Sequence, residues 1–476
     1  MSAHQDEPRL HRQERLTRTS RGRHSDKVGH GVGEIGSRWT ALALVAGAVV
    51  AGIAVRAFVF HQFSPKSLWG DEADYLRNAV RLAGGGGLDG IYRPPGYIFF
   101  LAGMAKLYSP PLDAARWGQI VLGAVSTVLL FLVARRAVGT RTAVLAAWIF
   151  ALYPTFIGFS LLIFVETLYA CLLLAATLAL LQAWEKRSLG STVLAGSLLG
   201  ASALAKSLSL PLALVFAGCW FLHERPRSAA LRAALFIASV ALVILPYAWR
   251  NHARYGGWVL VDTSISRTLW HANHIHYRPG FDWGISSLDE HYDGSKPPGA
   301  GPDPVKEHQE LLRRELGFVL QHPGLIAARI PAKMGAFWNP TTFVQRTLAR
   351  DAVPNLPRES LGALLVSIFI SSYYAAVLFL GIIGLLGAKR SRLLTGFLAM
   401  LAMFTLVHCV MVCQSRYRLP LMPFFSIFAA QTLMSRSGWP RPGSWRMWTV
   451  VALVGAALVL WWPYLPYVLL QRLEAW

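Results

Sequence analysis

The chain has 476 residues, of which 54% are hydrophobic and 15% are charged, and its formal net charge is +21. A soluble chain of this length would ordinarily divide into domains with charged surfaces. Instead, apolar runs of the roughly 20 residues that a helical membrane span needs recur along most of the sequence. These runs are continuous rather than alternating, so they exclude an ordinary soluble protein and predict an all-α polytopic membrane protein.

The N-terminal segment 1–38 is polar, with arginines at positions 9, 12, 15, 18 and 21. We interpret it as a cytoplasmic basic tail. It is either an unstructured tail that reinforces the topology or a basic amphipathic helix on the headgroups of membrane lipids. The positive charge does not indicate nucleic-acid binding, because it is spread along the chain and no recognition motif is present. The apolar segment 39–60 that follows is expected to be a retained anchor rather than a cleaved signal.

The apolar runs predict about eleven membrane spans. We place them near residues 39–60, 114–134, 142–162, 165–184, 190–206, 208–222, 229–248, 360–387, 393–413, 418–434 and 446–467. Residues 94–108 are apolar but short and begin with two prolines, which indicates a helix that lies at the membrane interface.

Basic residues predict the orientation of these spans. Clusters of lysine and arginine, such as those within 135–141, 185–187 and 389–392, all fall on one side. The positive-inside rule makes that side cytoplasmic, in the inner (plasma) membrane, and gives the first external loop, 61–113, and the long loop, 249–359, to the opposite face.

We divide the chain accordingly. The predicted parts are a cytoplasmic tail (1–38), an N-terminal membrane region (39–248), an extracytoplasmic module (249–359), C-terminal membrane helices (360–467) and an extracytoplasmic tail (468–476). Within the module, residues 305–321 and 323–338 have helical spacing.

The first external loop carries a cluster of carboxylates in a chain with few acids. Asp71, Glu72 and Asp74 precede a segment with apolar residues at helical spacing. One interpretation is therefore that Asp71 caps this helix. The other is catalysis, because a carboxylate at a dry membrane boundary can take a proton from a hydroxyl. Capping does not account for Glu166, which is predicted to lie on the same face.

Basic residues on that face are candidate partners for a phosphate. Guanidinium groups bind phosphate through two hydrogen bonds and stabilise charge on a leaving group. The candidates are Arg93, Arg250, Arg254, Lys333, Arg416 and Arg418. Arginines at an interface also extend to lipid headgroups, so simple anchoring is the alternative for each of them.

The side chains of His271, His274, His276 and Asp282 are of types that suit a transition metal. Their spacing matches no established metal site, so we predict none there, and the sequence leaves the role of segment 271–276 undetermined. The four cysteines lie in predicted spans, where we interpret them as packing residues.

Five motifs occur in order along the chain. They are Gly70-Asp71-Glu72-Ala73-Asp74-Tyr75, Arg93-Pro94-Pro95-Gly96-Tyr97, Val165-Glu166-Thr167-Leu168, Pro246-Tyr247-Ala248-Trp249-Arg250-Asn251 and Arg416-Tyr417-Arg418-Leu419-Pro420. Together they resemble the GT-C membrane glycosyltransferases, in the branch that contains protein O-mannosyltransferases and the lipid A aminoarabinose transferase. The order and spacing extend over residues 39–434, and the adjacent Asp-Glu pair is the most specific element.

The resemblance implies a GT-C-like helical bundle, a polyprenyl-phosphate sugar donor and an acceptor hydroxyl on an envelope glycan, lipid or protein. It also implies inversion at the anomeric carbon. No nucleotide or redox cofactor is required, since the phosphate ester is already activated, although some relatives use a divalent metal ion.

The resemblance also implies roles for individual residues. Asp71 corresponds to the catalytic base, and Glu72 to a second acid that shapes the site or positions the acceptor. Arg93 stands where a basic residue meets the donor phosphate. The expected companions of Arg93 are Arg250, Arg416 and Arg418, and the further site residues are Glu166, Asp74 and Tyr97.

Two positions depart from the aminoarabinose branch. Asp74 stands where that branch has a basic residue, and Tyr92 stands where it has an acid. The resemblance is therefore closer to the bacterial branch that modifies lipopolysaccharide and other envelope glycans.

Two other function classes compete with the enzyme. A transporter or flippase for a lipid-linked sugar would account for Arg56 within a span, but such proteins usually show internal repeats, which we do not find. A structural scaffold would tolerate loss of the acids.

Overall fold

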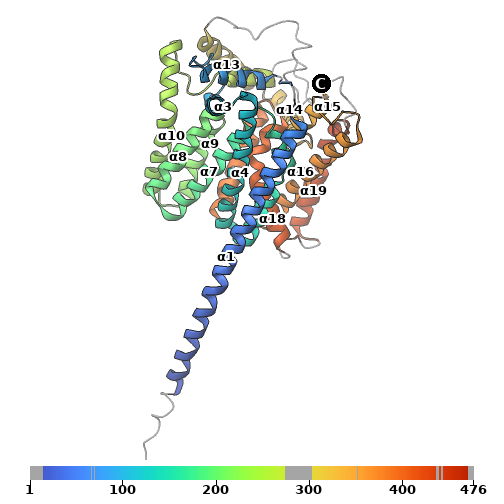
Figure 1. The fold of residues 1–476 in the computed structure, drawn as a ribbon. Helices are drawn as coiled ribbons and strands as arrows, with labels where there is room; N and C mark the ends of the chain where they lie inside the picture. Colours follow the sequence, from blue (N-terminus) through green and yellow to red (C-terminus); the bar gives the residue numbers. More distant parts are fainter. Residues whose placement is uncertain are drawn as a thin grey trace, which may run out of the picture. The chain divides into compact units, whose positions relative to one another are not determined.

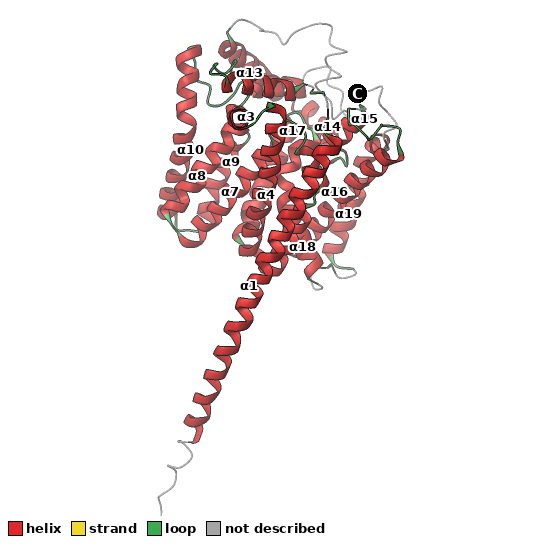
Figure 2. Cartoon of the chain, in the orientation of Figure 1, coloured by secondary structure: helices red, strands yellow, loops and turns green. Residues whose placement is uncertain are grey.

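The computed structural model describes residues 14–65, 67–68, 70–273, 303–350, 352–435, 439–440 and 443–469. These residues form helices and loops, with no strand among them (Figure 2). The contacts divide the chain into two units, residues 1–47 and residues 48–476. The first unit holds the start of α1 (Glu14–Phe63). Residues 14–38 are helical and not unstructured. They continue the helix of the apolar segment that follows, because extending an existing helix adds one backbone hydrogen bond for each residue.

The second unit contains the other helices. In chain order these are α2 (Asp71–Ala83), α3 (Pro95–Leu107), α4 (Pro111–Val138), α5 (Thr140–Ala151), α6 (Pro154–Phe159), α7 (Glu166–Lys186), α8 (Leu189–Ala205), α9 (Ser209–Cys219), η1 (Trp220–Leu222), α10 (Pro226–Tyr255), α11 (Ser264–Asn273), α13 (Pro304–Gln321), α14 (Pro323–Trp338), α15 (Phe343–Ala349), α16 (Leu361–Gly387), α17 (Arg392–Val410), η2 (Ser415–Leu421), α18 (Met422–Met434), α19 (Trp445–Trp461), η4 (Trp462–Tyr464) and α20 (Leu465–Val468).

Seven helical segments of the described residues are long and apolar enough to cross a membrane. They are Trp39–Phe63, Pro111–Val138, Glu166–Lys186, Pro226–Tyr255, Leu361–Gly387, Arg392–Val410 and Trp445–Tyr464. Four shorter apolar helices, Pro95–Leu107, Thr140–Ala151, Leu189–Ala205 and Ser209–Leu222, accompany them. The chain is therefore a multi-pass membrane protein, whereas the count of eleven full spans is not confirmed.

The predicted span 142–162 is broken in the structure. Helix α5 ends at Ala151 and α6 begins at Pro154. Proline has no N–H to donate and fits the first position of a helix, so the chain ends one helix and starts another at this point. Residues 160–165, which follow as turns and irregular loop, lead into α7, and Ile163 within them contacts the acidic helix α2.

The spans of the second unit pack side by side as a bundle (Figure 1). Helix α8 contacts both α7 and α10, α4 contacts α5 and α7, and α16 contacts α18. Aromatic rings also join α17 to α18, where Phe397 of α17 lies against Phe424, Phe425 and Phe428 of α18. Helices α3 and α13 lie together at one end of the bundle (Figure 1).

The sequence prediction of two helices in the long loop is confirmed. Segments 305–321 and 323–338 correspond to α13 and α14. Helix α13 starts at Pro304, with the Asp303 carboxylate accepting from the N–H groups of Val305 and Lys306. It packs on α11 and lies at the same end of the bundle as α3 (Figure 1).

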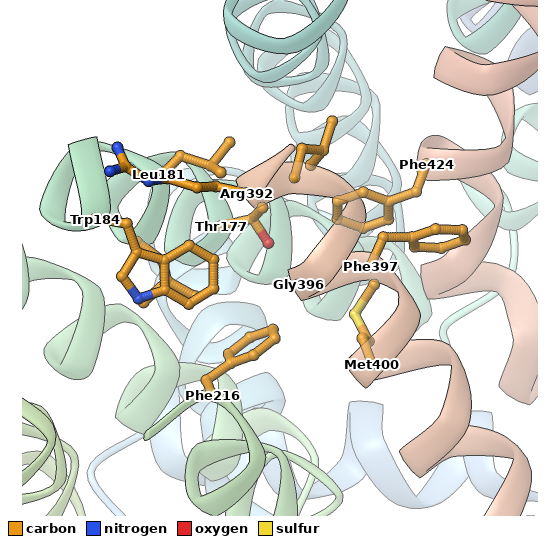
Figure 3. A pocket seen from close by; sticks show the side chains of 11 residues that line it. Thr177, Leu181, Trp184, Phe216, Arg392, Gly396, Phe397, Met400 and Phe424 are labelled. Atoms are coloured by element: carbon orange, nitrogen blue, oxygen red, sulfur yellow. The ribbon is translucent and has the colours of Figure 1, made fainter. Parts of the chain in front are cut away.

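A small cavity lies between α7, α9, α17 and α18 (Figure 3). Its walls are apolar apart from Thr177 and Arg392, and Trp184, Phe216 and Phe397 contribute rings. Its volume is 10 Å³, whereas a single water molecule needs roughly 10–15 Å³. This cavity is a packing defect of the core and not a ligand site.

Candidate active site

Helix α2 begins at Asp71, and the backbone conformation of Gly70 leads the chain into it. Gly70 is the N-cap, with φ at +54°, a conformation that favours glycine. It provides no side-chain cap. The interpretation of Asp71 as the helix cap is therefore wrong, because Asp71 lies inside the first turn and its carboxylate has other partners.

Those partners are two arginines from distant parts of the sequence. Arg93 Nη2 donates to Asp71 Oδ1 at 2.6 Å, and Arg416 Nη2 donates to Asp71 Oδ2 at 2.9 Å. Arg93 lies in the loop before α3, and Arg416 lies in η2. Each oxygen of the Asp71 carboxylate thus accepts a hydrogen bond from a different guanidinium, and these charge-assisted bonds restrict the orientation of the carboxylate.

The two guanidiniums determine the acidity of Asp71. Burial by itself would favour the protonated form, but the charges of Arg416 and Arg93 and their hydrogen bonds outweigh it. They lower the pKa of Asp71 to about 2. The same interaction raises the pKa of both arginines above the usual value. Asp71 is therefore fully ionised at neutral pH while both arginines bind it.

Arg416 connects this cluster to a second carboxylate. Glu166, the first residue of α7, is buried, and Arg416 Nε lies 3.9 Å from its Oε1. Lys206 Nζ donates to the same oxygen at 3.3 Å. The Lys206 ammonium also lies 4.5 Å from the centre of the Tyr417 ring. Arg416, Glu166 and Lys206 form one buried chain of alternating charge that ends at Asp71.

Three buried polar atoms in the side chains around Asp71 have no hydrogen-bond partner. They are Oε2 of Glu166 and the Nε atoms of Arg93 and Arg416. Buried polar atoms in folded proteins are nearly always satisfied, so several such atoms in one place favour a site that is completed by a ligand or by water.

Lys206 is a site residue that the sequence interpretation missed. It lies between the apolar helices α8 and α9, at the turn predicted to face the outside. A lone lysine between two apolar runs was the available signal. Gly96 makes its position possible, because a Cβ there would lie 2.8 Å from the backbone of Leu204 and Ala205. The start of α3 therefore contacts the end of α8 directly, with no room for a side chain.

Glu72 has a different environment from Asp71. Its side chain is buried, and Oε1 accepts from the backbone N–H of Ile163 at 2.8 Å. This bond ties α2 to the segment that leads into α7 and Glu166. In this structure Glu72 therefore links α2, which carries Asp71, to the segment before α7, which carries Glu166.

We expect Glu72→Ala to destabilise the protein by about 1–3 kcal/mol, because it leaves the buried N–H of Ile163 without an acceptor. Glu72→Gln retains an acceptor oxygen and should cost less. Thermal unfolding of the purified variants checks this order. If both variants unfold at the wild-type temperature, Glu72 does not hold these segments together.

Asp74 and Tyr97 lie beside the cluster. Asp74 Oδ2 accepts from Arg93 at 3.2 Å, and its other oxygen pairs with Arg77. Tyr97 donates to Gln119 Oε1 at 3.2 Å, and its ring meets the edge of Tyr75. The Tyr75 ring in turn lies 5.2 Å from the Arg93 guanidinium. Asp74 thus contacts Arg93 directly, whereas Tyr97 supports it through Tyr75.

The structure places Arg250 and Arg418 outside the cluster. Arg250 donates to Leu88 O at 3.4 Å and to Asn251 Oδ1 at 3.0 Å. Arg418 is buried and donates to Phe337 O at 2.8 Å and to Thr341 O at 3.3 Å. Neither forms an ion pair with the acids named above, so in this structure both brace neighbouring loops.

The other basic and metal-type candidates also lie apart. Lys333 is buried and donates to Asn273 Oδ1 at 3.0 Å and to Val410 O at 2.8 Å, and Arg254 is exposed. His274, His276 and Asp282 lie outside the described residues. Among the residues described, no three histidine, cysteine, aspartate or glutamate side chains are arranged to hold a metal ion.

The Asp71 cluster predicts a pH dependence of stability. The pKa of Asp71 is lowered from its ordinary 3.8 to about 2 on folding, so the unfolded chain binds more protons in this interval. The stabilising contribution is complete above the unfolded value and is lost as pH falls from about 4 toward 2. Thermal unfolding between pH 6 and pH 2.5 should show a steeper acid loss for wild type than for Asp71→Asn. Parallel curves would contradict this assignment.

Comparison with known proteins supports the fold. Residues 92–249 match the family of dolichyl-phosphate-mannose-protein mannosyltransferases, whereas no curated protein matches the chain. The archaeal oligosaccharyltransferase AglB of Archaeoglobus fulgidus, solved with an inhibitory peptide and a dolichol-phosphate, is similar over 91% of this chain and 56% of its own, at 14% identity and a TM-score of 0.50. This chain has a GT-C fold. It spans about half the length of that relative.

Two other GT-C structures show weaker likeness. ArnT of Cupriavidus metallidurans, bound to undecaprenyl phosphate, matches 82% of this chain and 77% of its own, at 12% identity and a TM-score of 0.41. The S. cerevisiae protein O-mannosyltransferase Pmt1-Pmt2 complex, bound to its sugar donor, matches 52% and 37%, at 18% identity and a TM-score of 0.37. The mannosyltransferase match includes Arg93, Glu166 and Lys206, while Asp71 and Arg416 lie outside it.

Proposed function

We propose that the chain is an integral membrane glycosyltransferase that moves a sugar from a polyprenyl-phosphate donor to an acceptor hydroxyl at the extracytoplasmic face. The observation that carries this proposal is the position of Asp71 between the guanidiniums of Arg93 and Arg416. One carboxylate and two phosphate-binding groups are what such a transfer requires in one place. The match of residues 92–249 to a sugar-transferring family supports the same reaction class.

The proposed step is a single displacement with inversion. The acceptor oxygen attacks the anomeric carbon, a new carbon–oxygen bond forms, and the bond from that carbon to the phosphate oxygen breaks. The electron pair leaves with polyprenyl phosphate, whose charge Arg93 and Arg416 stabilise. The hydroxyl proton passes to Asp71. Sugar, proton and phosphate are all accounted for without a further reactant.

The donor must change the partners of Asp71 for this step to proceed. With both oxygens bound to guanidiniums, Asp71 is a weak base, since its pKa is lowered to about 2. A phosphate at the site competes for the same N–H groups, and the free Nε atoms of both arginines are further donors for it. Weaker pairing raises the proton affinity of Asp71. Donor binding therefore activates the base.

Glu166 and Lys206 complete the proposed site. Lys206 neutralises Glu166 at 3.3 Å, which leaves the Arg416 guanidinium free to turn toward a phosphate. Glu166 Oε2 has no hydrogen-bond partner and is available to accept from a donor-sugar hydroxyl. Glu72 positions these groups through Ile163, and Asp74 orients Arg93.

The residue that favoured transport has a structural explanation. Arg56 is buried, and its Nη1 donates to the carbonyls of Gly52 at 3.0 Å and Ala151 at 2.8 Å. It thereby joins α1 to the end of α5, where the helix stops and leaves carbonyls without helical partners. The enzyme remains the better proposal.

The test is a transfer assay with the purified full chain in lipid nanodiscs. Polyprenyl-phosphate sugars are offered with envelope glycans, lipids and Ser/Thr peptides as acceptors, with and without a chelator to determine metal dependence. We expect sugar transfer with release of polyprenyl phosphate. If no donor is consumed but lipid-linked sugar crosses proteoliposome membranes, the chain is a transporter.

A further inference from the structure

A second cavity opens beside the Asp71 cluster. It lies between the loop before α3, helix α11 and helix α13, and has a volume of 130 Å³. Its polar lining comes from Tyr92, Thr263, Ser266, Arg267, Glu307 and His308. The mechanism above uses none of these side chains.

Hydrogen bonds between the three segments build this cavity. Thr263 N donates to Ile91 O at 2.9 Å, which fixes the loop against the start of α11. Arg267 Nη2 of α11 pairs with Glu307 Oε1 of α13 at 2.6 Å. Ser266 Oγ and His308 Nδ1 of the same two helices lie 2.9 Å apart. The walls are therefore held in place before any ligand binds.

The chemistry of the lining favours a neutral ligand rich in hydroxyl groups. Arg267 and Glu307 neutralise each other, so neither an anion nor a cation has a free counter-charge there. The lining offers hydrogen-bond donors and acceptors close to one another, from hydroxyls, an imidazole, a carboxylate and a guanidinium. This mixture suits a sugar, whose hydroxyls both donate and accept.

The size of the cavity suits one ring. An apolar protein cavity of about 150 Å³ holds benzene, and this cavity of 130 Å³ is close to that. A single pyranose ring can thus enter, and the remainder of a longer glycan would extend outward, since the cavity is open on one side.

Tyr92 connects the cavity to the Asp71 cluster. The guanidiniums of Arg267, in the cavity wall, and of Arg93, in the cluster, each lie 5.2 Å from the centre of the Tyr92 ring. Arg93 then binds Asp71 at 2.6 Å. Tyr92 and Arg93 therefore connect the wall of the cavity to Asp71 in two steps.

We propose that this cavity is the acceptor subsite and that the acceptor is a glycan, bound through one sugar ring between α11 and α13. This inference rests on the proposed glycosyl transfer and narrows its acceptor from glycan, lipid or protein to glycan. Arg267, Glu307 and His308 recognise the ring, and Tyr92 separates it from the donor phosphate.

The test compares two variants with a matched control. Glu307→Gln removes the charge that holds Arg267, and His308→Phe fills part of the cavity and removes the bond to Ser266. Glu310→Gln changes an exposed acid on the same helix, outside the cavity. Binding of methyl hexosides to the full chain in nanodiscs is measured by saturation-transfer NMR, and KM for a glycan acceptor is measured separately.

We expect methyl hexosides to bind wild type and Glu310→Gln. Binding to the two cavity variants should weaken about tenfold, as for loss of one hydrogen bond to a charged group. KM for the glycan should rise by the same factor with kcat and the donor KM unchanged. A protein that transfers sugar only to peptides, or whose hexoside binding and glycan KM are equal in all variants, would overturn the glycan subsite. Hexoside binding without any transfer would retain the subsite and remove the proposed function.

Discussion

Asp71→Asn should reduce sugar transfer by about 10²–10⁴-fold, the usual contribution of a general base. The amide has the shape of the carboxylate and retains an oxygen for one arginine, so the helix start at Gly70 and the neighbouring fold should persist. It cannot accept the acceptor's proton. Single-turnover transfer from a polyprenyl-phosphate sugar measures the loss directly, and donor binding should be retained, since both guanidiniums remain.

The matched control is Asp89→Asn, which changes an exposed aspartate of the same loop that pairs weakly with Arg81. Transfer by this variant should equal wild type. The acid limb of the wild-type pH profile adds a second readout. It should lie at higher pH for kcat than for kcat/KM, because donor binding draws Arg93 and Arg416 away from Asp71. Wild-type rates for Asp71→Asn would remove Asp71 from the role of base.

Arg416→Lys should lower kcat/KM for the donor by about 10²–10³-fold, as does loss of a group that stabilises a developing anion. Lysine keeps a positive charge beside Asp71 and Glu166, so the substitution changes the shape of the cation and not the sign of its charge. It lacks the planar, two-edged guanidinium that spans both acids and a phosphate. Kinetics with varied donor concentration should show the loss, while thermal unfolding changes little.

Arg254→Lys is the control, because Arg254 is an exposed arginine in the last turn of α10 and has no contact with Asp71 or Glu166. We expect wild-type kinetics from it. Equal donor KM and kcat in Arg416→Lys and wild type would show that η2 only anchors the chain. Loss confined to the acceptor KM would move Arg416 from the donor to the acceptor side of the site.

The sequence was informative where a residue's role depends on its neighbours in the chain. The apolar runs predicted a helical membrane protein, and helical spacing predicted α13 and α14. It was less informative where a helix ends. The apolar run 142–162 contains a helix break at Pro154. Hydropathy does not reveal this break, because it reflects side-chain polarity and not the backbone N–H that proline lacks.

For the candidate site, the sequence selected residues of suitable chemistry but could not choose among them. Arg93, Arg250, Arg416 and Arg418 are equivalent as arginines in predicted external segments. The structure pairs Arg93 and Arg416 with Asp71, and gives Arg250 and Arg418 to backbone carbonyls. Which guanidinium reaches which acid depends on loop paths and helix contacts, and these are set by packing.

By itself, the sequence determined that this chain is a bundle of membrane helices, with acids and arginines near the loops predicted to be external, because hydrophobicity and charge bias act locally. Only the tertiary structure decided that residues 71, 93 and 416 meet, that Lys206 belongs with Glu166, and that Glu72 binds a backbone N–H. The physical reason is that an ion pair between residues 345 positions apart forms only when α2, α3, α7 and η2 pack around it.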